Sequence, residues 1–374
     1  MNTNIRKVFE AFASEGTMSG YSAIDSGHIN ATYLIETEKG PSFVLQRINH
    51  RVFTNPEDVV ANKIKVSKHL FEKLRDRPDF GKETHVLNFL KTTSGGYIHR
   101  DEDGSYWNLM EYIENSRVYL KTPDRGIALE AGRAFGSFLA LTVDLDPSKV
   151  IETLPGFHSM KLRFEQFDEA LLNASSERKQ SASAQISIAN ELRQEMTSLE
   201  NLVGEGKIPT RVTHNDTKIS NALFSEEGQA LCVIDLDTVM EGVVHYDFGD
   251  AVRTICSSAD EDEPDPAKID FSLDYFAAFV DGFLGRSGLS LSKLEIEGLP
   301  KSAKMMTFIV GLRFLTDFLN NDIYFDTQYE EQNLARAKSQ FRRVELIEEN
   351  LGEMTNIVMN VSVRVQNKSG TVAK

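Results

Sequence analysis

The chain has 374 residues, of which 26% are charged and 41% hydrophobic, and its formal net charge is −15 at pH 7. This length allows a large core, divided between two lobes, and the negative charge argues against nucleic acid or an anionic membrane as the main partner. The two cysteines, Cys232 and Cys256, are too few for a disulfide framework or a thiolate zinc site.

The N-terminal stretch has no apolar core of the kind found in signal peptides, and its residues 4–14 predict a short helix. The longest apolar run, 305–319, is too short to span a bilayer. We therefore expect a cytoplasmic protein without a membrane partner. A monomer or a weak homodimer is expected.

Residues 21–36 predict a strand, a turn and a second strand, with the sequence Gly27-His28-Ile29-Asn30 at the tip. Small polar residues at such a tip can lay backbone N–H groups over nucleotide phosphates. Gly27 and Asn30 are thus candidates for nucleotide binding. A plain β-turn is the alternative, because this tip has a single glycine.

A third strand is predicted over 42–48, where alternation points either Gln46 or Arg47 inward. We favour Arg47 as a ligand of the nucleotide phosphates because it is charged; a surface salt bridge is the alternative. The following helix, from Asn55 to about Leu74, carries only Glu57 and Asp58 as early acids. A strand cation paired with a helix glutamate is therefore not evident.

Three further strands, 85–90, 97–100 and 106–113, complete a small antiparallel sheet. Glu111 and Ile113, at its end, are candidates for a hinge whose backbone binds adenine; a plain strand end is the alternative. The rest predicts helices, at 124–143, 159–173, 184–203, 251–256, 271–285, 291–298, 301–320 and 329–358. We expect a loop over 175–184, a frayed tail from Ser362, and two domains, 1–113 and 114–374.

The sequence His214-Asn215-Asp216-Thr217-Lys218-Ile219-Ser220-Asn221 has the spacing His-x-Asp-x-x-x-x-Asn, which is typical of a phosphoryl-transfer loop. Its Asp216 could accept a proton from an attacking hydroxyl. Lys218 could neutralise charge on the transferred group, and Asn221 could hold a metal ion. A chance match is the alternative for this motif alone.

Two apolar segments, 222–224 and 231–234, follow the loop and predict a hairpin that ends at Asp235. An acid after a buried strand is a suitable ligand for Mg²⁺. The order of loop, hairpin and acid therefore predicts a phosphoryl-transfer centre with Asn221 and Asp235 as metal ligands. Asp247 and Asp250 are expected to brace the next helix rather than bind metal.

Arg313 and Asp317 are four residues apart in an otherwise apolar helix. They could form an intrahelical salt bridge. Alternatively, Arg313 could face a polar substrate pocket, which Tyr324 could also line, because a charge in an apolar stripe needs a partner.

With these residues in place, the chain resembles the aminoglycoside phosphotransferase superfamily, and within it the N-acetylhexosamine 1-kinases. The segments that carry the resemblance span nearly the whole chain and are 27–33, 43–50, 155–158, 214–221, 233–237 and 311–317.

The resemblance implies an α+β, bilobal, protein-kinase-like fold with a small antiparallel-sheet N-lobe and a larger, mainly helical C-lobe. It implies ATP and Mg²⁺ as cofactors and an N-acetylhexosamine sugar as the acceptor. Asp216 matches the catalytic base, and His28 and Arg313 lie in segments that form the sugar pocket. Two alternatives are a kinase for aminoglycoside or choline-type acceptors and a non-catalytic nucleotide-binding module.

Overall fold

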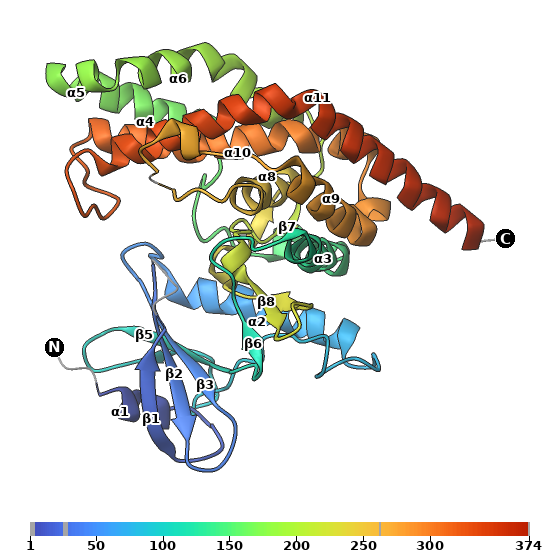
Figure 1. Ribbon diagram of the computed structural model, residues 1–374. Helices are drawn as coiled ribbons and strands as arrows, with labels where there is room; N and C mark the ends of the chain where they lie inside the picture. The colour runs from blue at the N-terminus through green and yellow to red at the C-terminus, as the bar shows by residue number, and fades with distance from the viewer. Residues whose placement is uncertain (1–3, 25–28, 262, 373–374) are drawn as a thin grey trace. The chain divides into compact units, whose positions relative to one another are not determined.

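The computed structural model describes residues 4–24, 29–261 and 263–372. The chain forms two compact units (Figure 1). The N-terminal unit consists of residues 1–118, 141–155 and 220–241, and the C-terminal unit contains the remaining residues. The predicted division into functional domains after residue 113 stays a prediction.

The N-terminal unit is built on a five-stranded antiparallel sheet with the strand order β1-β2-β3-β5-β4. The strands are β1 (Met18–Ala23), β2 (Ala31–Thr37), β3 (Phe43–Ile48), β4 (His99–Arg100) and β5 (Tyr106–Glu111). The central register places Leu45 opposite both Tyr33 and Leu109. The segment predicted as a strand at 85–90 instead contributes an isolated bridge, between Phe89 and Met110.

One core of this unit lies between the sheet and α1 (Ile5–Glu10), where Phe9 packs against Phe43 in a cluster that includes Leu45 and Trp107. Phe43 and Leu45 are two positions apart in β3, so they lie on the same face of the sheet and both enter this core. A second core lies beside α2 (Pro56–Leu74), whose proline stands at the start of the helix, where its missing N–H costs little.

The N-terminal unit also contains a small three-stranded sheet of β6 (Ser116–Arg117), β8 (Ala222–Ser225) and β9 (Ala230–Val233). Strands β8 and β9 pair antiparallel, which confirms the predicted hairpin. The short helices η1 (Pro147–Lys149) and η3 (Leu236–Thr238) belong to the same unit. Strand β10 (Met240–Gly242) and helix η2 (Ile219–Asn221) lie where the chain passes between the units.

The C-terminal unit is mainly helical and contains β7 (Arg211–Thr213). Its helices are α3 (Arg125–Thr142, which ends in the other unit), α4 (Met160–Asn173), α5 (Ser176–Ser181), α6 (Ser183–Met196), α7 (Ser198–Gly204), α8 (Val244–Ile255), η4 (Pro266–Lys268), α9 (Leu273–Ser287), η5 (Gly288–Ser290), α10 (Lys293–Leu319) and α11 (Gln332–Val372).

Helices α10 and α11 run side by side through this unit (Figure 1) and form its core together with α4 and α6. Phe308 and Phe341, one from each long helix, stack with ring centroids 5.4 Å apart. The two helices predicted at 291–298 and 301–320 are one, because Pro300 is accommodated within α10. The loop predicted at 175–184 is largely helix, and α11 continues beyond the predicted frayed end at Ser362.

Helices α3 and α9 touch through their backbones. A Cβ atom added at Gly132 would overlap the carbonyl oxygen of Phe279, and one added at Gly136 would overlap that of Phe283. The contact is reciprocal, because a Cβ at Gly282 would overlap the carbonyl of Leu129. The close approach of α3 and α9 therefore depends on these glycines.

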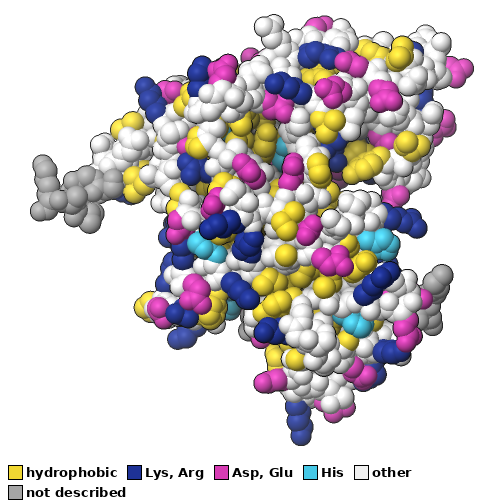
Figure 2. Space-filling view, turned by 180° about the vertical axis from the view of Figure 1, so that it is seen from behind, with side chains coloured by type: hydrophobic (Ala, Val, Ile, Leu, Met, Phe, Trp, Pro, Cys, Tyr) yellow, Lys and Arg dark blue, Asp and Glu magenta, His cyan; other side chains and the backbone are white. Residues whose placement is uncertain are grey.

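Lys and Arg side chains are interspersed with Asp and Glu side chains over the face seen in Figure 2. Within the described ranges, every helix is too short or too polar to cross a membrane.

Candidate active site

The predicted catalytic loop follows β7 in the C-terminal unit. Its first side chain, His214, is fully buried, with its ring 6.2 Å from that of Phe135 and 5.7 Å from that of Phe138 between centroids. Asn215 follows with a left-handed backbone, φ 63°, which asparagine tolerates better than most residues. The loop is therefore anchored on the apolar face of α3 immediately before Asp216.

Asp247, in the first turn of α8, holds this loop by its main chain. Its carboxylate accepts hydrogen bonds from the backbone N–H groups of His214, at 2.9 Å, and Asn215, at 2.7 Å. In return, the Thr217 hydroxyl donates to the Asp247 carbonyl oxygen at 2.5 Å. The bracing predicted for Asp247 is thus directed at the catalytic loop rather than at the following helix.

Burial raises the pKa of Asp247 to about 7, although the two backbone donors on His214 and Asn215 lower it. The nearby carboxylates of Asp250 and Asp216 add to the increase. Asp250 is itself paired with Arg253, through a 2.8 Å ion pair. The loop therefore rests on a carboxyl group whose charge is costly in its surroundings.

His158 contacts the loop from a second side. Its Nε2 atom lies 2.9 Å from the carbonyl oxygen of Asn215, and burial lowers the pKa of His158 to about 4. A carbonyl oxygen only accepts, so the neutral ring carries its proton on Nε2. Its ring also lies 4.4 Å from that of Phe157 and 5.0 Å from that of Tyr246.

Asp216 and Lys218 are more accessible than the residues that hold the loop. Their side chains are 24% and 35% exposed, and the Lys218 ammonium lies 3.1 Å from the Asp216 carboxylate. A carboxylate beside an ammonium can accept a proton from a hydroxyl group while the cation stabilises developing negative charge. The structure therefore brings together the two predicted catalytic residues.

Asn221 and Asp235 lie at the adjoining ends of β8 and β9 in the N-terminal unit. The backbone N–H of Ile234 donates to the Asn221 carbonyl oxygen at 2.8 Å, one step before Asp235. Asp235 has a left-handed backbone, φ 60°. Amide and carboxylate oxygens fit a hard cation such as Mg²⁺, which usually takes one or two protein ligands and completes its shell with water and phosphate.

Among the described residues, no group of three or more His, Cys, Asp and Glu side chains could hold a metal ion.

A buried polar cluster in the N-terminal unit was not anticipated from the sequence. The Lys63 ammonium, on α2, forms an ion pair with Asp237 and donates to the Gln46 side-chain oxygen at 2.7 Å. Asp237 also accepts from the amide of Asn30, whose own oxygen accepts from the Asn49 backbone N–H at 2.8 Å.

A sequence signal for Lys63 exists. It lies on the same helical face as Val59, Val66 and Leu70, which are all buried. A lysine inside an apolar stripe requires a buried partner. From the sequence, we considered only acids as charged partners on this helix, whereas here the helix supplies the cation.

On β3, the side chain that points inward is not the one that we expected. Gln46, not Arg47, points into the buried cluster, where it also accepts from the Asn108 amide at 3.3 Å. The Arg47 guanidinium lies over the ring of Trp107, 5.9 Å from its centroid. A role for Arg47 in binding nucleotide stays a prediction.

The other nucleotide candidates lie in the same unit. Glu111 ends β5 and donates its backbone N–H to the Asn88 carbonyl at 2.9 Å, and the Ile113 carbonyl accepts from the Ser116 hydroxyl at 2.5 Å. Gly27 and His28 lie outside the described residues.

Arg313, on α10, is surrounded by aromatic rings. Its guanidinium carbon lies 5.4 Å from the ring centroid of Phe157, 6.0 Å from that of Tyr324 and 5.5 Å from that of Phe325. This geometry is suited to cation–π attraction.

The alternative of an Arg313–Asp317 salt bridge does not match the contacts of Asp317. The Asp317 carboxylate instead accepts from the backbone N–H groups of Ile323, Tyr324 and Phe325, at 3.1, 2.9 and 3.0 Å. Asp317 therefore fixes the turn that carries Tyr324, and Arg313 is left among the rings.

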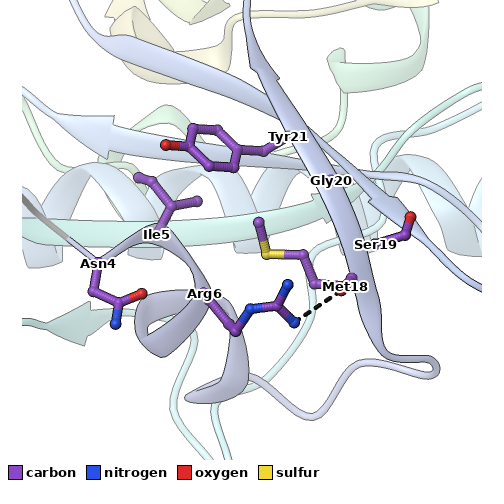
Figure 3. A pocket seen from close by; sticks show the side chains of 7 residues that line it. All are labelled: Asn4, Ile5, Arg6, Met18, Ser19, Gly20 and Tyr21. Carbon is purple, nitrogen blue, oxygen red and sulfur yellow. Dashed lines mark hydrogen bonds between the residues drawn. The ribbon is translucent and has the colours of Figure 1, made fainter.

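A surface hollow of about 640 Å³ lies between α1 and β1 (Figure 3). The Arg6 guanidinium closes one side of it by donating to the Met18 carbonyl oxygen at 2.8 Å. Among the described residues, those that line the hollow include none of the predicted site residues. The hollow is therefore separate from the predicted phosphoryl-transfer centre.

Comparison with known proteins identifies the class to which this arrangement belongs. Residues 20–279 match the phosphotransferase enzyme family (APH). The chain belongs to this family and is therefore a phosphotransferase that acts on a hydroxyl acceptor.

Solved structures share the fold at low sequence identity. A microcompartment-associated aminopropanol kinase is 16% identical, with a TM-score of 0.62 over 94% of this chain and 97% of that chain. An amicoumacin kinase in complex with AMP-PNP and Ca²⁺ is 11% identical, with a TM-score of 0.61 over 92% of both chains. A spectinomycin phosphotransferase in complex with ADP is 13% identical, with a TM-score of 0.54 over 96% and 97%. The predicted protein-kinase-like α+β fold is thus confirmed.

Proposed function

We propose that the protein is an ATP-dependent kinase that phosphorylates the anomeric hydroxyl of N-acetylhexosamine sugars. The observation that carries this proposal is the position of Arg313 relative to the catalytic loop. Arg313 contacts Phe157, the neighbouring His158 contacts the carbonyl of Asn215, and Asp216 follows directly. A pocket around Arg313 would therefore adjoin the proposed base.

The charges in this region favour a neutral acceptor over an amine. Arg313 and Arg163 are close enough that the Arg313 charge contributes to lowering the pKa of Arg163, to about 10, after the larger effect of burial. Two guanidinium groups would repel a cationic acceptor. They can donate hydrogen bonds to sugar hydroxyls and an N-acetyl carbonyl, and the rings of Phe157 and Tyr324 offer apolar faces to a pyranose.

In the proposed reaction, the C1 hydroxyl donates its proton to Asp216 as its oxygen attacks the γ-phosphorus of ATP. The new O–P bond forms as the bond to the β-phosphate bridging oxygen breaks, and ADP leaves. Lys218 offsets the charge on the transferring group. Asn221 and Asp235 would hold the divalent ion, which neutralises the ATP phosphates when bound.

The nucleotide is proposed to bind through the remaining predicted residues. Glu111 and Ile113 would meet adenine by their backbones, and Gly27, Asn30 and Arg47 would contact the phosphates. His28, Arg313 and Tyr324 would contact the sugar.

The proposal is tested by measuring ADP release with ATP and Mg²⁺ across N-acetylglucosamine, N-acetylgalactosamine, glucose, galactose, choline, 1-amino-2-propanol and kanamycin. We expect the N-acetylated sugars to give the highest kcat/KM, with a product that has lost its reducing end. Turnover confined to another acceptor would retain the kinase and overturn the sugar assignment.

A second candidate is a kinase for amino alcohols or aminoglycosides. It is favoured by the acceptors of the structural neighbours, which include an aminopropanol kinase and a Plasmodium vivax ethanolamine kinase. The same acceptor panel separates the two candidates. A non-catalytic nucleotide-binding module would bind ATP and leave every acceptor unchanged.

A further inference from the structure

The cluster around Lys63 buries a full pair of opposite charges in the N-terminal unit. The Lys63 side chain is 2% exposed and the Asp237 side chain 4% exposed. Gln46 and Asn30 supply additional hydrogen bonds to the two charged groups. The pair joins α2 to η3 and is held by polar side chains from β3 and from the residue before β2.

Stability alone does not explain such a pair. Removing two charges from water carries a desolvation cost that their mutual attraction often fails to repay, and well-packed apolar replacements of buried pairs are frequently as stable. A different explanation comes from its position in the chain. Asp237 lies in η3, two residues after the proposed metal ligand Asp235.

Asp237 connects this segment to the rest of the N-terminal unit. Asp237 is paired with Lys63, which lies on α2, and α2 packs against η3. The Lys63 ammonium also donates to Gln46 and so connects Asp237 to the sheet. Through Asn30, which is itself predicted to contact nucleotide, Asp237 is tied to the start of β2. One carboxylate thus fixes η3 to two elements on which the proposed nucleotide site depends.

We propose that Lys63 and Asp237 form a positioning pair that fixes Asp235 and the start of β2 for nucleotide and metal binding. This arrangement would use a cation on the helix and an amide on the strand, in place of a strand cation paired with a helix acid. The pair acts through Asp235 rather than by touching phosphate, because the Lys63 ammonium is buried and bonded to Asp237 and Gln46. The inference rests on nucleotide binding in the proposed function, but not on the identity of the acceptor.

The experiment compares three variants of the full-length protein: Lys63→Met, Asp237→Asn and the double variant Lys63→Met/Asp237→Leu. MgADP affinity is measured by calorimetry, the Mg²⁺ dependence of that affinity by titration, and folding by thermal melting. Lys65→Met is the matched control, because Lys65 is an exposed lysine on the same helix.

We expect each single variant to weaken MgADP binding at least tenfold and to raise the Mg²⁺ concentration needed for half-saturation. The double variant should melt near the temperature of the unchanged protein, since the buried charges are gone, yet bind MgADP as weakly as the single variants. Lys65→Met should leave both properties unchanged. Asp237→Asn nearly keeps the shape of the side chain, so this variant decides the question if the other variants fold poorly.

The double variant could regain both its melting temperature and its MgADP affinity. That result would show that the pair serves stability alone, and it would overturn the inference. Unchanged affinity in a folded Asp237→Asn variant would overturn it as well. A protein that binds MgADP but ignores every N-acetylated sugar would overturn the proposed acceptor while the nucleotide comparison still decides the role of the pair. If the unchanged protein binds no MgADP, both proposals are overturned.

Discussion

Residues 214–219 of the proposed catalytic loop and the surroundings of Arg313 lie in the same unit, but they are held in place by different means. The loop is fixed by main-chain hydrogen bonds to Asp247, and its His214 and Asn215 are 0% and 2% exposed. Arg313 contacts aromatic rings, one of which, on Tyr324, is 63% exposed. The loop is therefore constrained from several sides, whereas the proposed acceptor site around Arg313 includes an exposed aromatic ring.

Because of this difference, we expect the loop to determine the rate of phosphoryl transfer and the surroundings of Arg313 to determine which acceptor binds. Phosphoryl transfer needs a carboxylate and an ammonium at fixed positions, which a buried brace provides. Acceptor choice depends on shape and charge at a partly exposed surface, where different side chains can give different substrates. Changes to the loop should thus affect turnover, and changes around Arg313 should affect acceptor binding.

The largest effect is expected from Asp216→Asn, which removes the proposed base while keeping its shape. We expect kcat to fall by about 10³-fold, because a positioned general base typically contributes about 10²–10⁴-fold. The melting temperature should change little, since Asp216 is partly exposed. Steady-state kinetics and a thermal melt test this, and turnover close to that of the unchanged protein would exclude Asp216 as the base.

The next largest effect is expected from Asp247→Ala, which leaves the backbone N–H groups of His214 and Asn215 without their carboxylate acceptor. The free energy of unfolding should fall by about 1–3 kcal/mol, the cost of burying an unsatisfied polar group. We also expect kcat to drop by at least about tenfold, because the loop loses its fixed position. Denaturant unfolding and kinetics provide the measurements.

The matched control for this brace is Asp274→Asn, at an exposed carboxylate that pairs with Arg125 in the same unit. It should change the unfolding free energy by less than about 0.5 kcal/mol. An Asp247→Ala variant with full kcat would show that turnover does not depend on the hydrogen bonds from the loop to Asp247.

A smaller effect, of a different kind, is expected from Arg313→Gln. The KM for N-acetylhexosamine should rise about tenfold or more, as expected for loss of a charged hydrogen-bond donor, while the KM for ATP stays unchanged. Arg193→Gln is the control, because Arg193 also lies over an aromatic ring, that of Phe164, but on an exposed face. Equal effects of the two substitutions would remove Arg313 from the proposed pocket.

The smallest effect on turnover is expected at His245, which lies in the same helix as Asp247, α8, and contributes to stability instead. Burial lowers the pKa of His245 to about 4, and its Nε2 lies 3.0 Å from the Glu295 carbonyl oxygen. Between about pH 6.5 and pH 4 the unfolded chain therefore binds more protons at this residue than the folded chain does. The contribution of His245 to stability is complete above this window and is lost as pH falls through it.

Substituting His245→Gln should remove this pH dependence. The difference in unfolding free energy between the unchanged protein and the variant should change by about 1.4 kcal/mol per pH unit within the window. Subtracting the variant cancels the opposite dependence of Asp247, whose raised pKa lowers stability as pH rises toward 7. A difference that is flat with pH would show that His245 is not held neutral.

The proposed catalytic loop could be singled out from sequence because its residues are close together in the chain, and its catalytic role stays a prediction. Asp216 and Lys218 are two residues apart, and the hairpin that leads to Asp235 is a contiguous pattern of apolar residues. Strand alternation and helical periodicity likewise anticipated most elements of the fold.

Contacts between distant residues could not be predicted in the same way. The partner of Lys63 is 174 positions further along the chain, at Asp237, and no local pattern specifies which buried groups meet. The brace from Asp247 to the loop is of the same kind. Pro300 predicts a helix boundary because proline usually ends a helix, but here the packing of α10 in the core outweighs the local cost.

The direct backbone contact between α3 and α9 has a consequence for large-scale mutagenesis. With no side chain between them at Gly132 and Gly282, any displacement of α9 must displace α3. Helix α3 carries the two phenylalanine rings that hold His214 at the head of the catalytic loop. In a saturation scan scored by activity, these glycines should therefore rank beside the catalytic residues, although they would touch neither acceptor nor nucleotide.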